Sequence, residues 1–225
     1  MQCIIVKDPI FKKIKPSVKS LIFNDQFLED VKRNIAIFDP VCILINTAQK
    51  STSSLADIIH LWRKLEVPEE FQSFLEKRKK MAFNIYALCA YYIHPKYHDF
   101  AKNNFEEHET REVHTFFIEN LQAEDLLSLT LFKEKRGVFR KLFEKNCGDG
   151  FVFWKFAKVY YSALASLALK LLQIPSSSAQ IERVFSNWSF VHSPLRNRLS
   201  FEKSKKLLHV YYTHKIKDSN KSEDY

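Results

Sequence analysis

The chain has 225 residues, with 35 Lys and Arg against 26 Asp and Glu, which gives a formal net charge of +9 and a pI near 9.3. Hydrophobic residues make up 46% of it. A protein with this share of apolar residues has enough apolar surface to form a core, which excludes disorder throughout the chain. Only 3 residues are glycine, and none precedes Gly137. Glycine-rich phosphate loops, dinucleotide-binding motifs and tight hairpins need glycine, so the composition favours long helices instead.

Cysteine usage and hydropathy indicate an intracellular protein without a membrane span. The four cysteines are Cys3, Cys42, Cys89 and Cys147. None belongs to a C-x-x-C pair, and we expect reduced thiols, because disulfide frameworks belong to oxidising compartments. The N-terminus has no secretory signal pattern. The longest uncharged apolar stretch, residues 159–169, would cover about 17 Å as a helix, whereas the hydrocarbon of a bilayer is about 30 Å thick.

Apolar residues recur at helical spacing in blocks that end near prolines. The first block covers residues 27–38, and Pro40 begins or kinks a second apolar run over residues 41–45. The next block covers residues 55–65, with Ser54 as its expected N-cap. The sequence therefore predicts a mostly helical N-terminal region.

The middle of the chain contains the longest predicted helix and an acidic segment. Residues 71–92 predict one helix of about seven turns that stops at Pro95. Residues 99–125 hold eight acids and two bases, which indicates a solvated helix or loop surface. The segment from Cys147 to Gly150 contains two of the three glycines and is the best boundary in the chain.

The distribution of charge and the glycine-containing segment at residues 147–150 divide the chain into three parts. Residues 1–150 carry 23 bases and 21 acids, whereas residues 151–225 carry 12 bases and 5 acids, so most of the basic excess lies in the last third. We expect a helical region over residues 1–150, a compact helical unit over residues 151–217 and a flexible tail over residues 218–225.

Three helices are predicted in the last third. Residues 156–172 are apolar almost all round, which is typical of a helix at the centre of a core. Ser177 and Gln180 fit a capping box at the start of the next helix, and Ser200 is the expected cap of the final one. The apolar residues of these last two helices are Ile181, Val184, Phe185, Trp188, Phe201, Leu207, Leu208 and Tyr211.

Residues 174–208, IPSSSAQIERVFSNWSFVHSPLRNRLSFEKSKKLL, resemble the C-terminal dimerisation region of hAT-superfamily transposases and of proteins derived from them. The family pattern is roughly P-x-x-S-A-x-S-E-R-x-F-S followed by R-N-R-L-S. The first half is matched by Pro175, Ser178, Ala179, Glu182, Arg183, Phe185 and Ser186, and the second by Arg196, Asn197, Arg198, Leu199 and Ser200. Ile181 departs from the pattern, which usually has Ser there. Residues 54–65 and 87–97 are similar to parts of the helical insertion of that family.

The resemblance implies a fold and a catalytic position. hAT transposases cut DNA with two Asp and one Glu on a ribonuclease-H-like fold, and Glu182 occupies the position of that Glu. A pair of Mg²⁺ ions needs several oxygen ligands, and no strand-borne Asp pair precedes Glu182. We therefore expect a mainly α fold whose ribonuclease-H-like sheet is largely absent, with no catalysis and no cofactor. Mg²⁺ would be relevant only if the Asp residues were supplied elsewhere.

Other candidate sites concern DNA and metals. The possible DNA-contact residues are Arg183, Arg196, Arg198, Lys203, Lys205 and Lys206. The alternative for this set is a solvated face that keeps the chain soluble. The basic run Lys77–Lys80 is either a nuclear import signal or the wet side of a helix, and the nucleus is the favoured compartment over the cytoplasm. Cys89, His94 and His98 lack the spacing of a zinc site, so no metal site is expected.

The favoured function is that of a transposase-derived interaction protein that forms a homodimer through its C-terminal unit. The candidate interface residues are Phe185, Trp188, Leu207, Leu208 and Tyr211, and packing within one chain is the rival role for the same side chains. Two other interpretations stay open. One is a fragment of a DNA-cutting transposase, and the other is a regulator that binds DNA weakly through the basic last third. No membrane partner or small-molecule substrate is expected.

Overall fold

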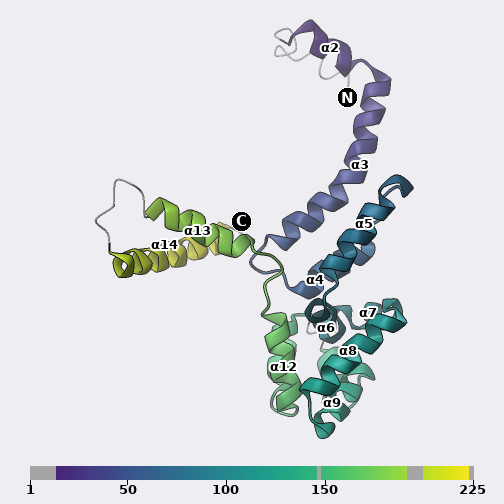
Figure 1. The fold of residues 1–225 in the computed structure, drawn as a ribbon, viewed down its shortest axis with the longest axis vertical. Coiled ribbons are helices and arrows are strands. Elements are labelled where there is room, and N and C mark those ends of the chain that lie inside the picture. Colours follow the sequence, from purple (N-terminus) through teal and green to yellow (C-terminus); the bar gives the residue numbers. More distant parts are fainter. Residues whose placement is uncertain (1–13, 146–147, 192–199, 223–225) are drawn as a thin grey trace.

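The computed structural model describes residues 14–145, 148–191 and 200–222, and these are almost entirely helical (Figure 1). The mainly α prediction is confirmed. Across these ranges the structure contains no sheet, and the one β feature is an isolated antiparallel bridge between Ser54 and Pro175. None of the described helices is long and apolar enough to cross a membrane.

A helical body forms the lower part of the molecule in Figure 1. Its elements are α4 (Leu55–Lys64), α6 (Ile85–Ile93), η2 (Pro95–Tyr97), α7 (His98–Asn104), α8 (Glu107–Asn120), α9 (Ala123–Lys133), α10 (Val138–Glu144), α11 (Gly150–Ala157) and α12 (Ser162–Leu172). Helix α6 lies at its centre, because every residue from Ala87 to Ile93 is buried and α4, α8 and α12 all pack on it. A helix that is apolar on all sides is expected in such a position.

The core of the body is aromatic and joins the two sides of residue 150. Phe132 and Phe139 from the first side pack against Phe153 and Trp154 from the second, with ring centroids 5.0 to 6.0 Å apart. The indole N–H of Trp154 also donates a hydrogen bond to the Ile93 carbonyl at 3.1 Å. Asp149 caps α11 at the predicted boundary. The packing across residue 150 is continuous, and the division of the chain into units there stays a prediction.

Two predicted long helices are each broken into two. Over residues 71–92, α5 (Glu69–Ala82) ends and α6 begins two residues later, where the Asn84 side chain accepts a hydrogen bond from the Ala87 amide. Over residues 156–172, α11 ends at Ala157 and α12 begins at Ser162. The predictions of single helices were wrong because apolar residues recur at helical spacing on both sides of each break.

Other local predictions have mixed outcomes. The predicted cap at Ser54 is confirmed, because its hydroxyl accepts from the Asp57 amide and the Asp57 carboxylate accepts from the Ser54 amide. The acidic segment 99–125 is not simply a solvated surface, since Glu109, Val113 and Phe117 are buried in it. Residues 27–45 form a single helix that passes through Pro40.

Two projections leave the body. One consists of α2 (Pro16–Ile22) and α3 (Asp25–Ala48), and α5 lies beside the C-terminal half of α3 (Figure 1). The other is a hairpin of α13 (Ala179–Val191) and α14 (Phe201–Ser222), which pack on each other. The C-terminal end of α3 meets the start of the hairpin, and from there the two projections extend in different directions (Figure 1).

Candidate functional site

The α13–α14 hairpin has a narrow buried seam. Leu208 is 9% exposed and Ser204 is fully buried where α14 packs on α13, and Asn187 is buried on the α13 side. At the far end of the hairpin the rings of Trp188 and Phe201 lie 5.4 Å apart. Among the side chains that the structure describes, the Ser204 hydroxyl is one of two buried groups without a hydrogen-bond partner. The small Ser204 side chain suits a close approach of the two helices.

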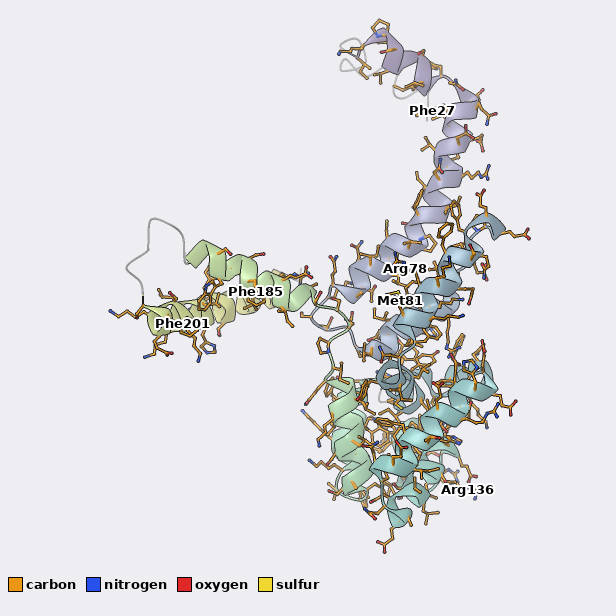
Figure 2. The ribbon with its side chains drawn as sticks, in the orientation of Figure 1. Phe27, Arg78, Met81, Arg136, Phe185 and Phe201 are labelled. Atoms are coloured by element: carbon orange, nitrogen blue, oxygen red, sulfur yellow. The ribbon has the colours of Figure 1, made fainter. Side chains whose placement is uncertain are left out.

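The outer surface of the hairpin carries several exposed apolar side chains. Phe185, which is 64% exposed, follows Ile181 by one helical turn on α13 (Figure 2). The exposed apolar residues of α14 are Phe201, Leu207, Val210 and Tyr211. We call the set of Ile181, Phe185, Leu207, Val210 and Tyr211 the hairpin face. Exposed apolar side chains gathered on both helices of one hairpin are typical of a protein contact site.

The hairpin face contains some of the predicted interface residues and not others. Phe185, Leu207 and Tyr211 are exposed, and Trp188 is partly buried at the end of the hairpin. Leu208 lies in the seam. Of the predicted interface residues, Leu208 therefore packs inside the chain, whereas Phe185, Leu207 and Tyr211 are exposed.

Serine hydroxyls join the base of the hairpin to the end of α3. Ser176 and Ser177 each donate a hydrogen bond to the Ala48 carbonyl, at 2.9 and 2.7 Å. Ala48 is the last residue of α3, and its carbonyl has no partner within the helix. The Ser177 hydroxyl also accepts from the Ala179 amide at 3.3 Å, two residues along the chain, and the predicted capping box stays a prediction. The Gln180 half of the predicted capping box lies outside the described side chains.

Glu182 is placed at the start of α13 and is exposed. Its carboxylate accepts a hydrogen bond from the Ser178 hydroxyl at 2.7 Å. Within residues 14–145, 148–191 and 200–222, no three His, Cys, Asp or Glu side chains come together in a way that could hold a metal ion. Because a Mg²⁺ pair needs several carboxylate oxygens, the surroundings of Glu182 do not fit one.

The DNA-contact candidates that the structure describes come from both helices of the hairpin. Lys203 and Lys206 are exposed and lie about one turn apart on α14, whereas Lys205 is on a different side of that helix. Arg183 is exposed on α13. Arg196 and Arg198 lie outside the described residues.

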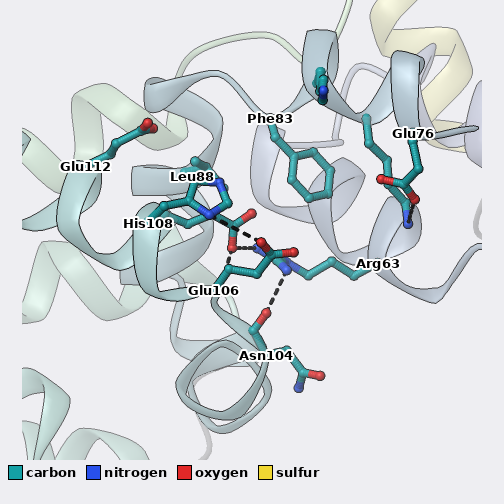
Figure 3. A pocket seen from close by; sticks show the side chains of 11 residues that line it. Arg63, Glu76, Phe83, Leu88, Asn104, Glu106, His108 and Glu112 are labelled. Atoms are coloured by element: carbon teal, nitrogen blue, oxygen red, sulfur yellow. Dashed lines mark hydrogen bonds and ion pairs between the residues drawn. The ribbon is translucent and has the colours of Figure 1, made fainter.

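A buried ion pair in the body was missed by sequence reasoning. Arg63 Nη2 lies 2.6 Å from Glu109 Oε2, and Arg63 Nη1 donates to the Asn104 carbonyl at 2.7 Å (Figure 3). The guanidinium carbon also lies 5.0 Å from the ring centroids of Phe83 and Phe105. Arg63 and Glu109 are 46 positions apart in the sequence, so no local pattern indicates the pair. They line a cavity of about 430 Å³.

Burial shifts the pKa of several side chains in the body. Desolvation lowers the pKa of His94 to about 4, although the charge of Asp57 opposes this shift. Desolvation also lowers the pKa of Lys133 to about 8, and the Lys133 ammonium lies 3.7 Å from the ring centroid of Tyr92. Burial raises the pKa of the Cys89 thiol to about 12, which keeps this thiol protonated and unreactive at neutral pH.

Comparison with known families gives one match. Residues 138–213 match the hAT family C-terminal dimerisation region. This segment is an hAT dimerisation region. It extends from α10 into α14, so the match includes the aromatic core around Phe139, Phe153 and Trp154 as well as the hairpin. No match was found among curated proteins.

Proposed function

We propose that the chain is an interaction protein that forms a homodimer, with the hairpin face as its contact surface. The observation that carries this proposal is that the hAT dimerisation region ends in a hairpin whose outer side chains, Phe185 and Leu207 among them, are apolar and exposed. Burying such side chains against a second copy is favourable by roughly 1.5 to 3 kcal/mol each.

Symmetry supports a dimer over other assemblies. Most soluble homo-oligomers are closed by a two-fold axis, and each contact of the hairpin is then made twice. Stable interfaces bury about 800 Å² on each partner. Two copies of the hairpin face supply apolar side chains from both α13 and α14, and the exposed Lys203 lies one turn before Leu207 on the same side of α14.

Under this proposal, the chain keeps the dimerisation function of a transposase and not its DNA-cutting function. The matched region is one for dimerisation. Glu182, the residue at the position of the catalytic Glu, is hydrogen bonded to Ser178, and in the described part of the chain no three His, Cys, Asp or Glu side chains gather in a way that could hold a metal.

The dimer proposal is tested by placing a charge on the hairpin face. Phe185→Asp and Leu207→Asp are expected to weaken dimerisation by at least about tenfold, because an unpaired carboxylate is costly in an apolar contact. Light scattering measures the oligomeric state and circular dichroism measures the helical content. The matched control is Val159→Asp, since Val159 is 82% exposed within the same family region but outside the hairpin. Unchanged dimers in both hairpin variants would contradict the proposal.

A second candidate function is weak DNA contact, which is favoured by the shared side of Lys203 and Lys206 on α14. Binding through phosphates releases counterions and therefore weakens steeply between about 50 and 200 mM salt. Duplex binding that falls in this way, and that is lost in Lys203→Glu with Lys206→Glu, supports this function. A flat salt response or a strong preference for one sequence contradicts it.

A further inference from the structure

Helix α3 has a long exposed apolar stripe. The stripe consists of Phe27, Val31, Ile35, Phe38, Cys42 and Ile45, all of which are exposed. Their spacing of three or four residues keeps them on one side of the helix. From Phe27 to Ile45 the stripe extends for about 27 Å. Leu44, on another side of α3, is buried in a cluster with Leu65 and Leu75. Helix α5 packs beside that face, and Phe38 of the stripe lines a pocket together with Phe71 of α5.

The charges of α3 and of the hairpin are opposite. Residues 25–48 carry four acids and two bases, whereas residues 179–191 and 201–214 together carry two acids and four bases. The acids on α3 include the exposed Asp30 and Asp39, and the bases on the hairpin include the exposed Lys203 and Lys206. Opposite potentials beside two apolar surfaces are a feature of surfaces that recognise each other.

One chain does not bring these two surfaces together. The Ala48 carbonyl at the end of α3 accepts hydrogen bonds from Ser176 and Ser177 at the base of the hairpin. From this junction α3 and the hairpin diverge (Figures 1 and 2). Contact between the stripe and the hairpin face therefore requires a second copy of the chain.

We propose that in the dimer the hairpin of one copy lies along the α3 stripe of the other, and that the reciprocal contact is made by the second hairpin. This inference rests on the proposed dimer and names the surface that the hairpin face meets. A two-fold axis closes such an exchange, because each copy contributes one hairpin and one α3. A hairpin-to-hairpin dimer would leave both α3 stripes exposed.

Charge reversal separates the two kinds of dimer. One variant carries Asp30→Lys with Asp39→Lys on α3, and a second carries Lys203→Glu with Lys206→Glu on the hairpin. Each variant alone is expected to dimerise at least about tenfold more weakly than the wild type, because like charges then meet in the contact. An equimolar mixture of the two is expected to form mixed dimers with wild-type strength, since both contacts in the mixed pair have opposite charges.

The α3 variant alone distinguishes this inference from the dimer proposal. If it dimerises like the wild type while Phe185→Asp does not, the contact on α3 is wrong and the hairpin dimer stands. If neither change affects a dimer, both claims are wrong. Circular dichroism serves as the folding control for each variant.

Reactivity of Cys42 gives a readout that needs no change on either surface. In a Cys3→Ser, Cys147→Ser background, Cys42 is the exposed thiol, because Cys89 is buried. Its rate of reaction with a thiol reagent is expected to fall at least about fivefold as the protein concentration is raised and the dimer forms. An unchanged rate across a concentration series in which light scattering shows dimerisation would overturn the inference.

Discussion

The Ser177 hydroxyl donates a hydrogen bond to the Ala48 carbonyl at 2.7 Å and so joins residues 129 positions apart. Ser176 donates to the same carbonyl at 2.9 Å. The end of α3 and the start of α13 are thereby held at one junction, from which the two exposed apolar surfaces extend.

Replacing both serines tests whether this junction is important for assembly. Ser176→Ala with Ser177→Ala is expected to lower the free energy of unfolding by about 1 kcal/mol per hydrogen bond and to weaken dimerisation, because the direction of the hairpin is no longer fixed. Chemical denaturation and light scattering measure the two effects. Ser189→Ala is the control, since the Ser189 hydroxyl bonds within α13 to the Phe185 carbonyl. Equal behaviour of the control and the double variant would speak against the junction.

The ion pair of Arg63 and Glu109 is expected to be critical for the body. The two side chains are 11% and 6% exposed, and Arg63→Met leaves the Glu109 carboxylate buried without its cation. Such a loss costs about 3 to 5 kcal/mol, and chemical denaturation measures it. Adding Glu109→Leu is expected to recover part of the loss.

The matched control for Arg63 is Arg140→Met. Arg140 pairs with Glu144 at 3.0 Å, but both side chains are exposed, and exposed pairs contribute only about 0 to 1 kcal/mol. A destabilisation of Arg63→Met no larger than that of Arg140→Met would show that the buried pair is dispensable.

The free energy of unfolding is expected to decrease as the pH is lowered, because of His94. The unfolded chain binds a proton at this residue below its ordinary pKa of 6.5, whereas burial lowers the pKa in the folded protein to about 4. The contribution of His94 is therefore fully present above about pH 6.5 and is lost as the pH falls towards 4. Desolvation lowers the pKa of His98 too, which adds to the effect with the same sign.

Urea denaturation at several pH values tests this prediction. His94→Asn removes the titrating group and keeps an acceptor for the Lys96 amide, which bonds to His94 Nδ1 at 3.2 Å. The variant should lose stability less steeply than the wild type between pH 6.5 and 4. Identical slopes in the two proteins would show that His94 is not responsible.

The surroundings of Glu182 predict that purified protein does not cleave DNA in the presence of Mg²⁺ or Mn²⁺. One exposed carboxylate cannot hold a metal pair, so Glu182→Gln should change neither activity nor helical content. Gel assays on duplex and hairpin DNA make the comparison. Metal-dependent nicking that disappears in Glu182→Gln would reverse this conclusion.

Features marked by a short, unambiguous motif were predicted, and those that depend on competing local signals or on distant contacts were not. The cap at Ser54 and the dimerisation region were evident from short motifs. The break at Asn84 was missed because a capping side chain and a continuous apolar pattern compete in the same segment. The burial of Glu109 depends on Arg63, which no local pattern connects to it.

The candidate site was also predicted only in part. The sequence shows that both hairpin helices have apolar sides, but it does not divide them into a seam and an outer face. Leu207 and Leu208 are adjacent, yet the first is exposed and the second is buried. That difference depends on how α14 packs on α13. The α3 stripe has the spacing of a core helix, and its exposure follows from where α4 and α5 lie.

Sedimentation equilibrium of the wild-type chain from about 1 to 100 μM is the most direct test of the central claim. The account predicts a reversible monomer–dimer equilibrium with dimer predominant at tens of micromolar, since the hairpin face and the α3 stripe are both apolar and exposed. A single species of monomer mass, 26.6 kDa, throughout the range would contradict it.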